Sequence, residues 1–340
     1  MNRFTLVRLP TLQAASERVA KAPTTRRFRA GGIDIIDHLK ERLDAPDELV
    51  ELRAIAGEVG DTMRRIDATD GAWTIGALVT LAQLGDFEDL GGAFTGIREA
   101  AGSAATPGIR NAATVGGNLL QRPRCWYYRH VDLECLKKGG SQCFALTGDN
   151  RYHAILGGGP SYIVHASTLA VALVAHDAKV RIAAASGERT IGIGELFALP
   201  TVDPEREHTL KAGEIIVAIE LPKAGSPRPG EEADQRSAYS ATKEKASHDW
   251  PLGEAAVRLT LAGGKLTNVR VALGHVAPIP WRAKEAEKLL EGQAPSADLF
   301  EKAGDAAVAG AKPLDHNGYK IPLVAGLVRD ALHRATGLAF

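Results

Sequence analysis

The stretch Ile109-Arg110-Asn111-Ala112-Ala113-Thr114-Val115-Gly116-Gly117-Asn118-Leu119 decides how we interpret this sequence, because it joins two adjacent glycines to hydroxyl and amide side chains. Glycine lets a backbone approach a phosphate closely, and hydroxyl and amide groups add hydrogen bonds. Thr106 and Gly108 extend the same pattern upstream. The stretch is suited to binding a pyrophosphate and a ribityl chain, although a long surface loop is the alternative.

A second glycine pair lies in Arg29-Ala30-Gly31-Gly32-Ile33-Asp34, between a predicted strand and a predicted helix. A helix N-terminus adds partial positive charge, so phosphate binding is chemically reasonable there. Taken alone, such a pair is more often a simple turn. The spacing is not G-x-G-x-x-G, so a Rossmann nicotinamide site is not supported. Two glycine loops in one chain fit a dinucleotide held from two sides, with backbone N–H donors from both loops.

The predicted elements indicate an α+β protein. Short strands and helices alternate through the first part, and a strong β-hairpin signal over Ala255–Leu261 and Leu266–Leu273 precedes three helices. We also expect a helix over Phe87–Gly102 and a strand over Ile163–His165. The stretch 223–236 is rich in proline, glycine and charge and is interpreted as a linker. The predicted units are a first domain, 1–222, with subdomains of about 1–56 and 57–222, and a C-terminal domain, 237–340.

Composition excludes several classes of partner. The 340-residue chain has 41 Lys+Arg and 41 Asp+Glu, so it has no charge excess that favours nucleic acid or an anionic membrane. No apolar run approaches the roughly 20 residues that span a bilayer. The N-terminal residues lack a signal-peptide pattern. We therefore expect a cytoplasmic protein, or a periplasmic one exported with a partner that carries the signal.

All three cysteines, Cys125, Cys135 and Cys143, fall within one short stretch. An odd count argues against a disulfide scaffold. Zinc sites usually contain closely spaced cysteine pairs, and the C-x9-C-x7-C spacing disfavours one. An iron–sulfur cluster is compatible with the wide spacing, and three reduced structural thiols are the alternative. No G-x-S-x-G or H-E-x-x-H motif occurs, so no catalytic residue is assigned.

Together these motifs resemble the flavoprotein subunit of the xanthine dehydrogenase family, over essentially the whole chain. Ala30–Asp34 is similar to the family's first pyrophosphate loop, with Ile33 in place of a threonine. Ile109–Leu119 is similar to its second loop, and Thr74–Ala77 to its I-G-A segment. Lys243–Leu252 resembles the start of its C-terminal domain. The FAD-binding residues that the resemblance implies are Arg29, Ala30, Gly31, Gly32, Ile33, Asp34, Ile75, Thr106, Gly108, Asn111, Thr114, Gly116, Gly117, Asn118, Thr168 and Lys243.

The resemblance implies a two-subdomain FAD-binding domain of the vanillyl-alcohol-oxidase-like type, followed by a C-terminal α+β domain with an antiparallel sheet and helices. It also implies an electron-relay subunit of a molybdenum hydroxylase. The expected partners are a large molybdenum-cofactor subunit, a small subunit with two [2Fe–2S] clusters, and an external electron acceptor. A stand-alone flavin-dependent alcohol oxidase and a non-redox scaffold are the alternatives.

The cysteine stretch forms an insertion, about 122–158, that ordinary members of the family lack. It is similar to the insertions of 4-hydroxybenzoyl-CoA reductase and of bacterial periplasmic aldehyde oxidoreductases. That resemblance implies a [4Fe–4S] cluster with Cys125, Cys135 and Cys143 as metal ligands. The fourth ligand stays open among Tyr152, His153, Ser161 or none. Thr168 stands where relatives carry a carboxylate.

Overall fold

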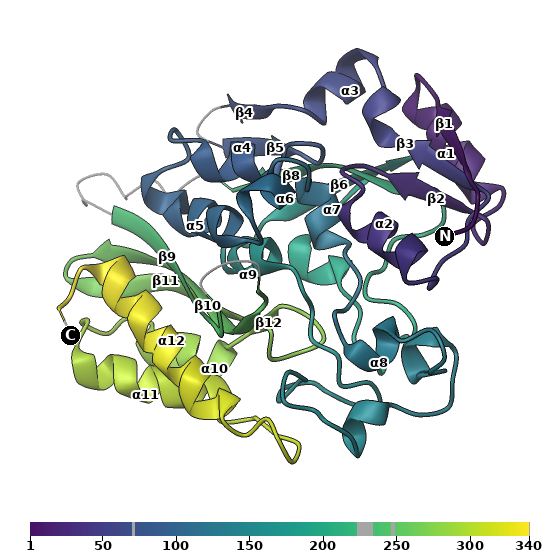
Figure 1. Cartoon of the computed structure of the whole chain (residues 1–340). Helices are drawn as coiled ribbons and strands as arrows, with labels where there is room; N and C mark the ends of the chain where they lie inside the picture. Colours follow the sequence, from purple (N-terminus) through teal and green to yellow (C-terminus); the bar gives the residue numbers. More distant parts are fainter. Residues whose placement is uncertain (70–71, 223–233, 246–248, 340) are drawn as a thin grey trace.

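The first part of the chain forms a small parallel sheet with two helices. The computed structural model describes residues 1–69, 72–222, 234–245 and 249–339 (Figure 1). Its first sheet has the order β1-β3-β2. The strands are parallel, and their connections pass through helices that begin directly after β1 and β2. The bounds are β1 Thr5–Arg8, α1 Leu12–Ala20, β2 Arg26–Arg29, α2 Ile33–Lys40 and β3 Glu48–Glu51.

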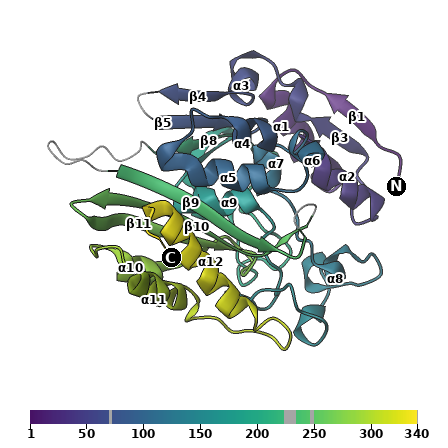
Figure 2. The same cartoon turned by 60° about the vertical axis from the view of Figure 1, so that its left-hand side comes forward.

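The second sheet has five antiparallel strands in the order β4-β5-β8-β6-β7. Several helices of this part lie between its sheet and the C-terminal sheet (Figure 2). α9 is buried on every side, which fits its run of apolar residues. The elements are α3 Gly57–Thr62, β4 Ile66–Thr69, β5 Ala72–Gly76, α4 Leu81–Asp86, α5 Thr95–Ser103, α6 Pro107–Arg110, α7 Val115–Leu119, α8 Trp126–Arg129, α9 Thr168–Ala175, β6 Lys179–Ala184, β7 Gly187–Gly192 and β8 Ile215–Leu221.

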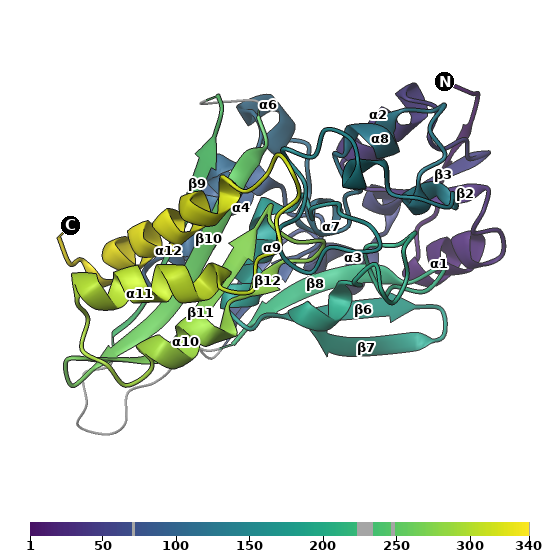
Figure 3. The same cartoon turned by 90° about the horizontal axis from the view of Figure 1, so that it is seen from below.

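The C-terminal part is a four-stranded antiparallel sheet in the order β12-β11-β10-β9. Three helices cover one face of it (Figure 3). α9 and α5 pack against strands of this sheet, so the two larger sheets share a helical layer. The elements are β9 Asp234–Lys243, β10 Pro251–Ala262, β11 Lys265–Gly274, β12 Trp281–Arg282, α10 Lys284–Leu290, α11 Ala297–Val308 and α12 Lys320–Thr336.

The predicted α+β class is confirmed, and several element boundaries differ. The helix expected over Phe87–Gly102 begins only at Thr95, because Gly91 and Gly92 disfavour a continuous α-helix before it. The strand expected over Ile163–His165 is extended backbone outside any sheet. Residues 223–233 of the expected linker lie outside the described residues, and 234–236 begin β9. No helix among the described residues is both long enough and apolar enough to cross a membrane.

Candidate functional site

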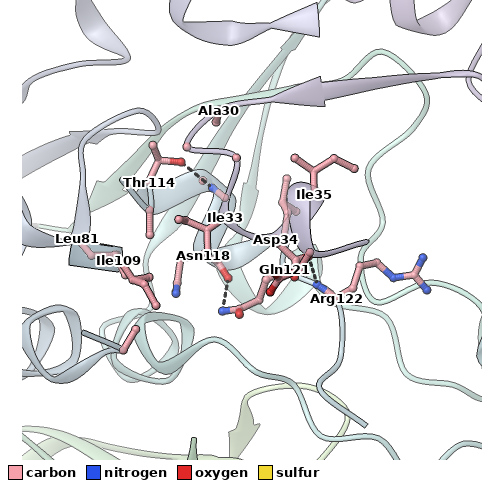
Figure 4. A pocket seen from close by; sticks show the side chains of 18 of the residues that line it. Ala30, Ile33, Asp34, Ile35, Leu81, Ile109, Thr114, Asn118, Gln121 and Arg122 are labelled. Carbon is pink, nitrogen blue, oxygen red and sulfur yellow. Dashed lines mark hydrogen bonds between the residues drawn. The ribbon is translucent and has the colours of Figure 1, made fainter. Parts of the chain in front are cut away.

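A cavity of about 690 Å³ lies where loops from the N-terminal sheet, the central helices and the C-terminal sheet meet. This volume falls in the range of about 300–1,000 Å³ that is usual for cofactor sites. Both glycine loops line it, and Figure 4 shows residues of the two loops around the same space. Trp250 and Pro251 reach the cavity from the start of β10.

The first loop turns from β2 into α2 through Gly31 and Gly32. Gly32 has φ +83°, a left-handed conformation that favours glycine. A Cβ on Gly31 would overlap the carbonyl oxygen of Ala112, so this glycine permits the two loops to touch. Among the described residues, the first α2 amide with a backbone acceptor is that of Ile36, bonded to the Gly32 oxygen at 3.0 Å. The N–H groups that precede Ile36 in this turn have no backbone acceptor, as is usual at the start of a helix. They are therefore available to a ligand.

The second loop differs from the expectation that its glycine amides face the ligand. The Gly116 N–H donates to Ala77 O at 2.9 Å, and the Gly117 N–H donates to Thr114 Oγ1 at 3.2 Å. The Gly117 amide thus stabilises the start of α7, and the Gly116 amide connects α7 to the residue after β5. A Cβ on Gly117 would lie 3.0 Å from Thr114 Oγ1 and meet no other atom within 4 Å. This loop therefore contributes open space and side chains, while the first loop contributes the amide donors.

The structure brings most predicted binding residues to one cavity. Its lining includes Ala30, Gly31, Gly32, Ile33, Asp34, Thr114, Gly116, Gly117, Asn118, Thr168 and Lys243. The other five do not line it. Arg29 pairs with Glu51, Ile75 is fully buried in β5, Thr106 caps α6, Gly108 lies in α6 with open space at its Cβ position, and the Asn111 amide donates to Pro107 O.

Arg122 and Arg124 line the cavity, although the sequence analysis did not single them out. Arg124 lies 2.8 Å from Asp34, and the Arg122 amide donates to the same carboxylate at 2.9 Å (Figure 4). The dense run of arginines after the second loop is the sequence feature that could have pointed to these two residues. Arg122 also pairs with the buried Glu207 at 2.8 Å, so the cavity wall carries cations with carboxylate partners.

Asp34 is held ionised by its surroundings. Burial alone raises the pKa of this carboxyl, but the neighbouring Arg124, His38, the Arg122 amide and Arg129 outweigh burial and lower it. His38 lies 4.0 Å away, and burial lowers its pKa to about 4, so it is neutral at pH 7. Asp34 therefore acts as an anchor for the arginines as well as a lining residue.

Lys243 and Thr168 line the cavity from the side of the C-terminal sheet and α9. The Lys243 ammonium donates to Ser103 O at 2.6 Å. Burial lowers the pKa of Lys243, while the nearby Glu254 raises it. Thr168 is 3% exposed and begins α9 directly after the capping residue Ser167. These two residues add polar groups to the lining of the same cavity.

The three cysteines are free and lie in one irregular segment around α8. The pKa of Cys125 is raised to about 12, mainly by burial and to a lesser extent by Cys143 and Cys135, although backbone hydrogen bonds from Tyr128 and Tyr127 oppose the shift. Within the described part of the chain, no three His, Cys, Asp or Glu side chains are arranged to hold a metal ion. Cys125, Cys135 and Cys143, expected from the sequence as metal ligands, therefore do not form a ready site for a single metal ion.

Of the candidate fourth ligands, His153 lies against the cysteine segment. Its Nε2 is 3.2 Å from Cys125 Sγ, and burial lowers its pKa to about 4. The Tyr152 hydroxyl instead donates to Glu244 at 2.8 Å. Ser161 is buried, at 1% exposure.

The cavity suits a dinucleotide. It combines free amides at a helix start, a glycine-lined wall that side chains would obstruct, and cationic side chains in one space. FAD carries a pyrophosphate between two ring systems, so these residues fit its chemistry.

Sequence comparisons agree with this fit over the whole chain. Residues 2–224 match the family described as FAD binding domain in molybdopterin dehydrogenase, and residues 237–335 match the CO dehydrogenase flavoprotein C-terminal domain. The aldehyde oxidoreductase FAD-binding subunit PaoB of Escherichia coli is 31% identical, covering 100% of both chains. The carbon monoxide dehydrogenase medium chain of Afipia carboxidovorans is 29% identical and covers 91% of this chain and 88% of that one.

Solved structures show the same fold. A chain of carbon monoxide dehydrogenase from Hydrogenophaga pseudoflava superposes with a TM-score of 0.74 at 22% identity, covering 98% of both chains. A chain of Cu,Mo-CO dehydrogenase gives a TM-score of 0.74 at 24% identity, covering 100% of this chain and 99% of that one. The two family matches, taken with the cavity, show that this chain belongs to the FAD-binding subunits of the molybdopterin dehydrogenases, or molybdenum hydroxylases.

Proposed function

We propose that the chain holds FAD in the cavity between its two glycine loops and relays electrons within a molybdenum hydroxylase complex. The cavity carries this proposal, because its free amides and its glycine wall lie in the same space. Bound FAD would accept electrons from an iron–sulfur cluster and release them to an external acceptor. The residues of this chain bind and orient it, and no side chain here need act as a general acid or base on an organic substrate.

The binding mode follows from which groups are free. The first turn of α2 offers its amides, so the pyrophosphate would lie against Gly32 and Ile33. Gly117 leaves room for it, and Asn118 and Thr114 border the same space. Thr168 and Lys243, which line the same cavity, would help to hold the flavin end of the cofactor. The five predicted residues outside the lining would support the loops without touching the cofactor.

The partners we propose are a large molybdenum-cofactor subunit that oxidises the substrate and a small subunit with two [2Fe–2S] clusters. Relatives named as medium chains and as FAD-binding subunits of oxidoreductases support this arrangement. The 31% identity to an aldehyde oxidoreductase subunit favours aldehydes as the substrate of the complex. The units 1–222 and 237–340 are proposed as its two domains. The complex would reside in the cytoplasm, or in the periplasm when a partner carries the signal.

We further propose a [4Fe–4S] cluster on the cysteine segment. All three cysteines are free and lie in one segment, and His153 Nε2 lies 3.2 Å from Cys125 Sγ. A four-iron cluster separates its thiolates more widely than a single ion does, so its ligands need not converge as ligands of one ion do. Cys125, Cys135 and Cys143 would supply thiolates, and His153 would supply the fourth ligand.

A visible spectrum with flavin and iron analysis of anaerobically purified chain tests both proposals. About one FAD per chain supports the flavin proposal, and flavin-free protein that does not take up added FAD would refute it. Iron at about four atoms per chain supports the cluster. Iron-free protein with full flavin would reject the cluster alone.

A further inference from the structure

Asn118 lines the cavity proposed for FAD with a side-chain amide whose two ends differ in chemistry. Its Nδ2 donates hydrogen bonds, whereas its Oδ1 only accepts them. Phosphate oxygens are acceptors, so a pyrophosphate gains from Asn118 only when Nδ2 points toward it. A reversed amide would place Oδ1 against those oxygens. The group that fixes the direction of this amide therefore affects how tightly the cofactor is bound.

Ser167 holds the Oδ1 end of this amide. Its hydroxyl donates to Asn118 Oδ1 at 2.6 Å, a distance that is usual for an O–H···O bond and short for an N–H···O bond. The same Ser167 Oγ accepts the N–H of Ala170 at 3.0 Å, as the cap of α9. Ser167 is 1% exposed and is not part of the cavity lining. It therefore acts on Asn118 from behind the cavity wall.

A reversed amide would leave the Ser167 hydroxyl proton without an acceptor. Asn118 Nδ2 would then donate to Ser167 Oγ, which already accepts the Ala170 N–H. Among the residues that the structure describes, Asn118 Oδ1 is the one acceptor of the Ser167 hydroxyl proton. A buried donor that loses its acceptor is costly. The buried serine thus favours the orientation in which Oδ1 faces Ser167 and Nδ2 faces away from it.

The backbone around Asn118 and Ser167 is held in place by further hydrogen bonds. Gln121 Nε2 donates to Asn118 O at 3.0 Å and to Ala166 O at 3.1 Å, which ties the two segments together (Figure 4). The Ser167 N–H donates to His165 Nδ1 at 3.3 Å. Asn118 Nδ2 itself has no hydrogen-bond partner in the described ranges of the chain. This donor is therefore left for a ligand.

We propose that Ser167 is a positioning residue that holds the Asn118 amide with Nδ2 toward bound FAD. The inference rests on the proposed function, in which the pyrophosphate lies against Gly32 and Ile33 in the same cavity. The amide of Gly117 is already used by Thr114 Oγ1, so Asn118 Nδ2 is a donor that the second loop can still offer. Ser167 does not touch the cofactor and acts only through Asn118.

The test separates this positioning role from the capping of α9. Chains stripped of flavin are titrated with FAD, with flavin fluorescence giving the Kd, and their thermal midpoints are measured. Ser167→Ala should raise the Kd about tenfold, the usual effect of losing one hydrogen bond. It should also lower the midpoint by about 2 °C, because α9 loses its cap.

A double-mutant cycle shows whether Ser167 acts through Asn118. In a chain that carries Asn118→Ala, adding Ser167→Ala should leave the Kd unchanged, because no amide remains to orient. The midpoint should still fall, because the cap is lost in either background. Asn118→Asp keeps an acceptor for Ser167 but turns a carboxylate oxygen toward the pyrophosphate. It should raise the Kd about 100-fold or more through repulsion.

Ser296→Ala is the matched control for the loss of a helix cap. Ser296 caps α11 by accepting the Leu299 N–H at 3.2 Å and lies outside the cavity lining, so this variant should lose thermal stability and keep the wild-type Kd. A wild-type Kd in Ser167→Ala or in Asn118→Asp would overturn the positioning role. An equal rise in Kd on adding Ser167→Ala with and without Asn118 would overturn it too, since the effect would then come through α9. A wild-type chain that binds no FAD would instead refute the proposed function.

Discussion

The Asp34 carboxylate lies 2.8 Å from the Arg124 guanidinium and thereby fastens the first glycine loop to the start of the cysteine segment. Arg129 reaches the same oxygen at 3.0 Å. Asp34 also stands in the first turn of α2, where a negative charge is favoured by the helix dipole. One carboxylate thus serves the cofactor loop and the neighbouring insertion together.

Asp34→Asn should lower the free energy of unfolding by about 2 kcal/mol at pH 7, the usual value for losing a charge-assisted hydrogen bond. Because the pKa of Asp34 is lowered in the fold, its contribution is present above the ordinary carboxyl pKa near 4 and is lost below it. Urea unfolding at pH 7 measures the loss. Asp37→Asn is the control, since Asp37 is 46% exposed and 3.5 Å from Arg124. Equal effects of the two substitutions would contradict this anchoring role.

The protein should lose stability as the pH falls from about 6.5 toward 4. Burial lowers the pKa of His38 and His208 to about 4 and that of His165 to about 3. The unfolded chain therefore binds protons first, and each histidine removes about 1.4 kcal/mol per pH unit in this window. Urea midpoints at pH 7.5, 6 and 5 test this, and His208→Gln should reduce the slope. Unchanged midpoints over this range would be inconsistent with buried neutral histidines.

The iron content of the chain should depend on all three cysteines together. Anaerobically prepared chain is expected to hold about four irons, and Cys135→Ser should release them together, because a cluster lacking one of its thiolates is not retained. Cys135 is 4% exposed, so serine fills the same space without adding bulk. Iron analysis and the visible spectrum give the answer. Three thiols that react freely with an alkylating reagent in the native protein, with no iron present, would end the cluster proposal.

The chain on its own should not turn over an organic substrate. Substrate oxidation belongs to the molybdenum subunit in this proposal, so purified FAD-loaded chain should show no aldehyde-dependent or purine-dependent reduction of its flavin. Adding the two partner subunits should start that reduction. Flavin reduction by an aldehyde or alcohol in the isolated chain would instead favour a stand-alone flavin oxidase.

The sequence could predict the two glycine loops because their chemistry is local. Gly32 needs a left-handed turn, and Thr114 caps α7, and both follow from neighbouring residues. The sequence could not show that the Gly117 amide donates a hydrogen bond to Thr114 Oγ1, because this bond exists only once α7 has formed. Whether an amide is free for a ligand is decided by tertiary geometry.

Long-range contacts explain why the sequence did not reveal the other residues of the site. Arg122 reaches the first loop from a distant part of the chain, and Trp250 reaches the cavity from the start of β10. The run of arginines marks Arg122 only as part of a cationic stretch, and Trp250 looks like an ordinary residue in a charged stretch, so neither position shows from the sequence which loop or cavity it reaches. The buried contact of Glu254 with His275 was equally hidden, since alternating strand residues give no indication that a carboxylate faces inward.

Flavin content of Gly117→Val tests the central claim most directly. A valine there would project into the cavity with only Thr114 Oγ1 close by, so the fold should persist while the space for FAD is lost. Gly108→Ala is the matched control, because its Cβ position is open and Gly108 lies outside the cavity lining. We expect wild-type and Gly108→Ala protein to hold about one FAD per chain, and Gly117→Val to hold almost none with an unchanged circular dichroism spectrum. Full flavin content in Gly117→Val would contradict the assignment of this cavity to FAD.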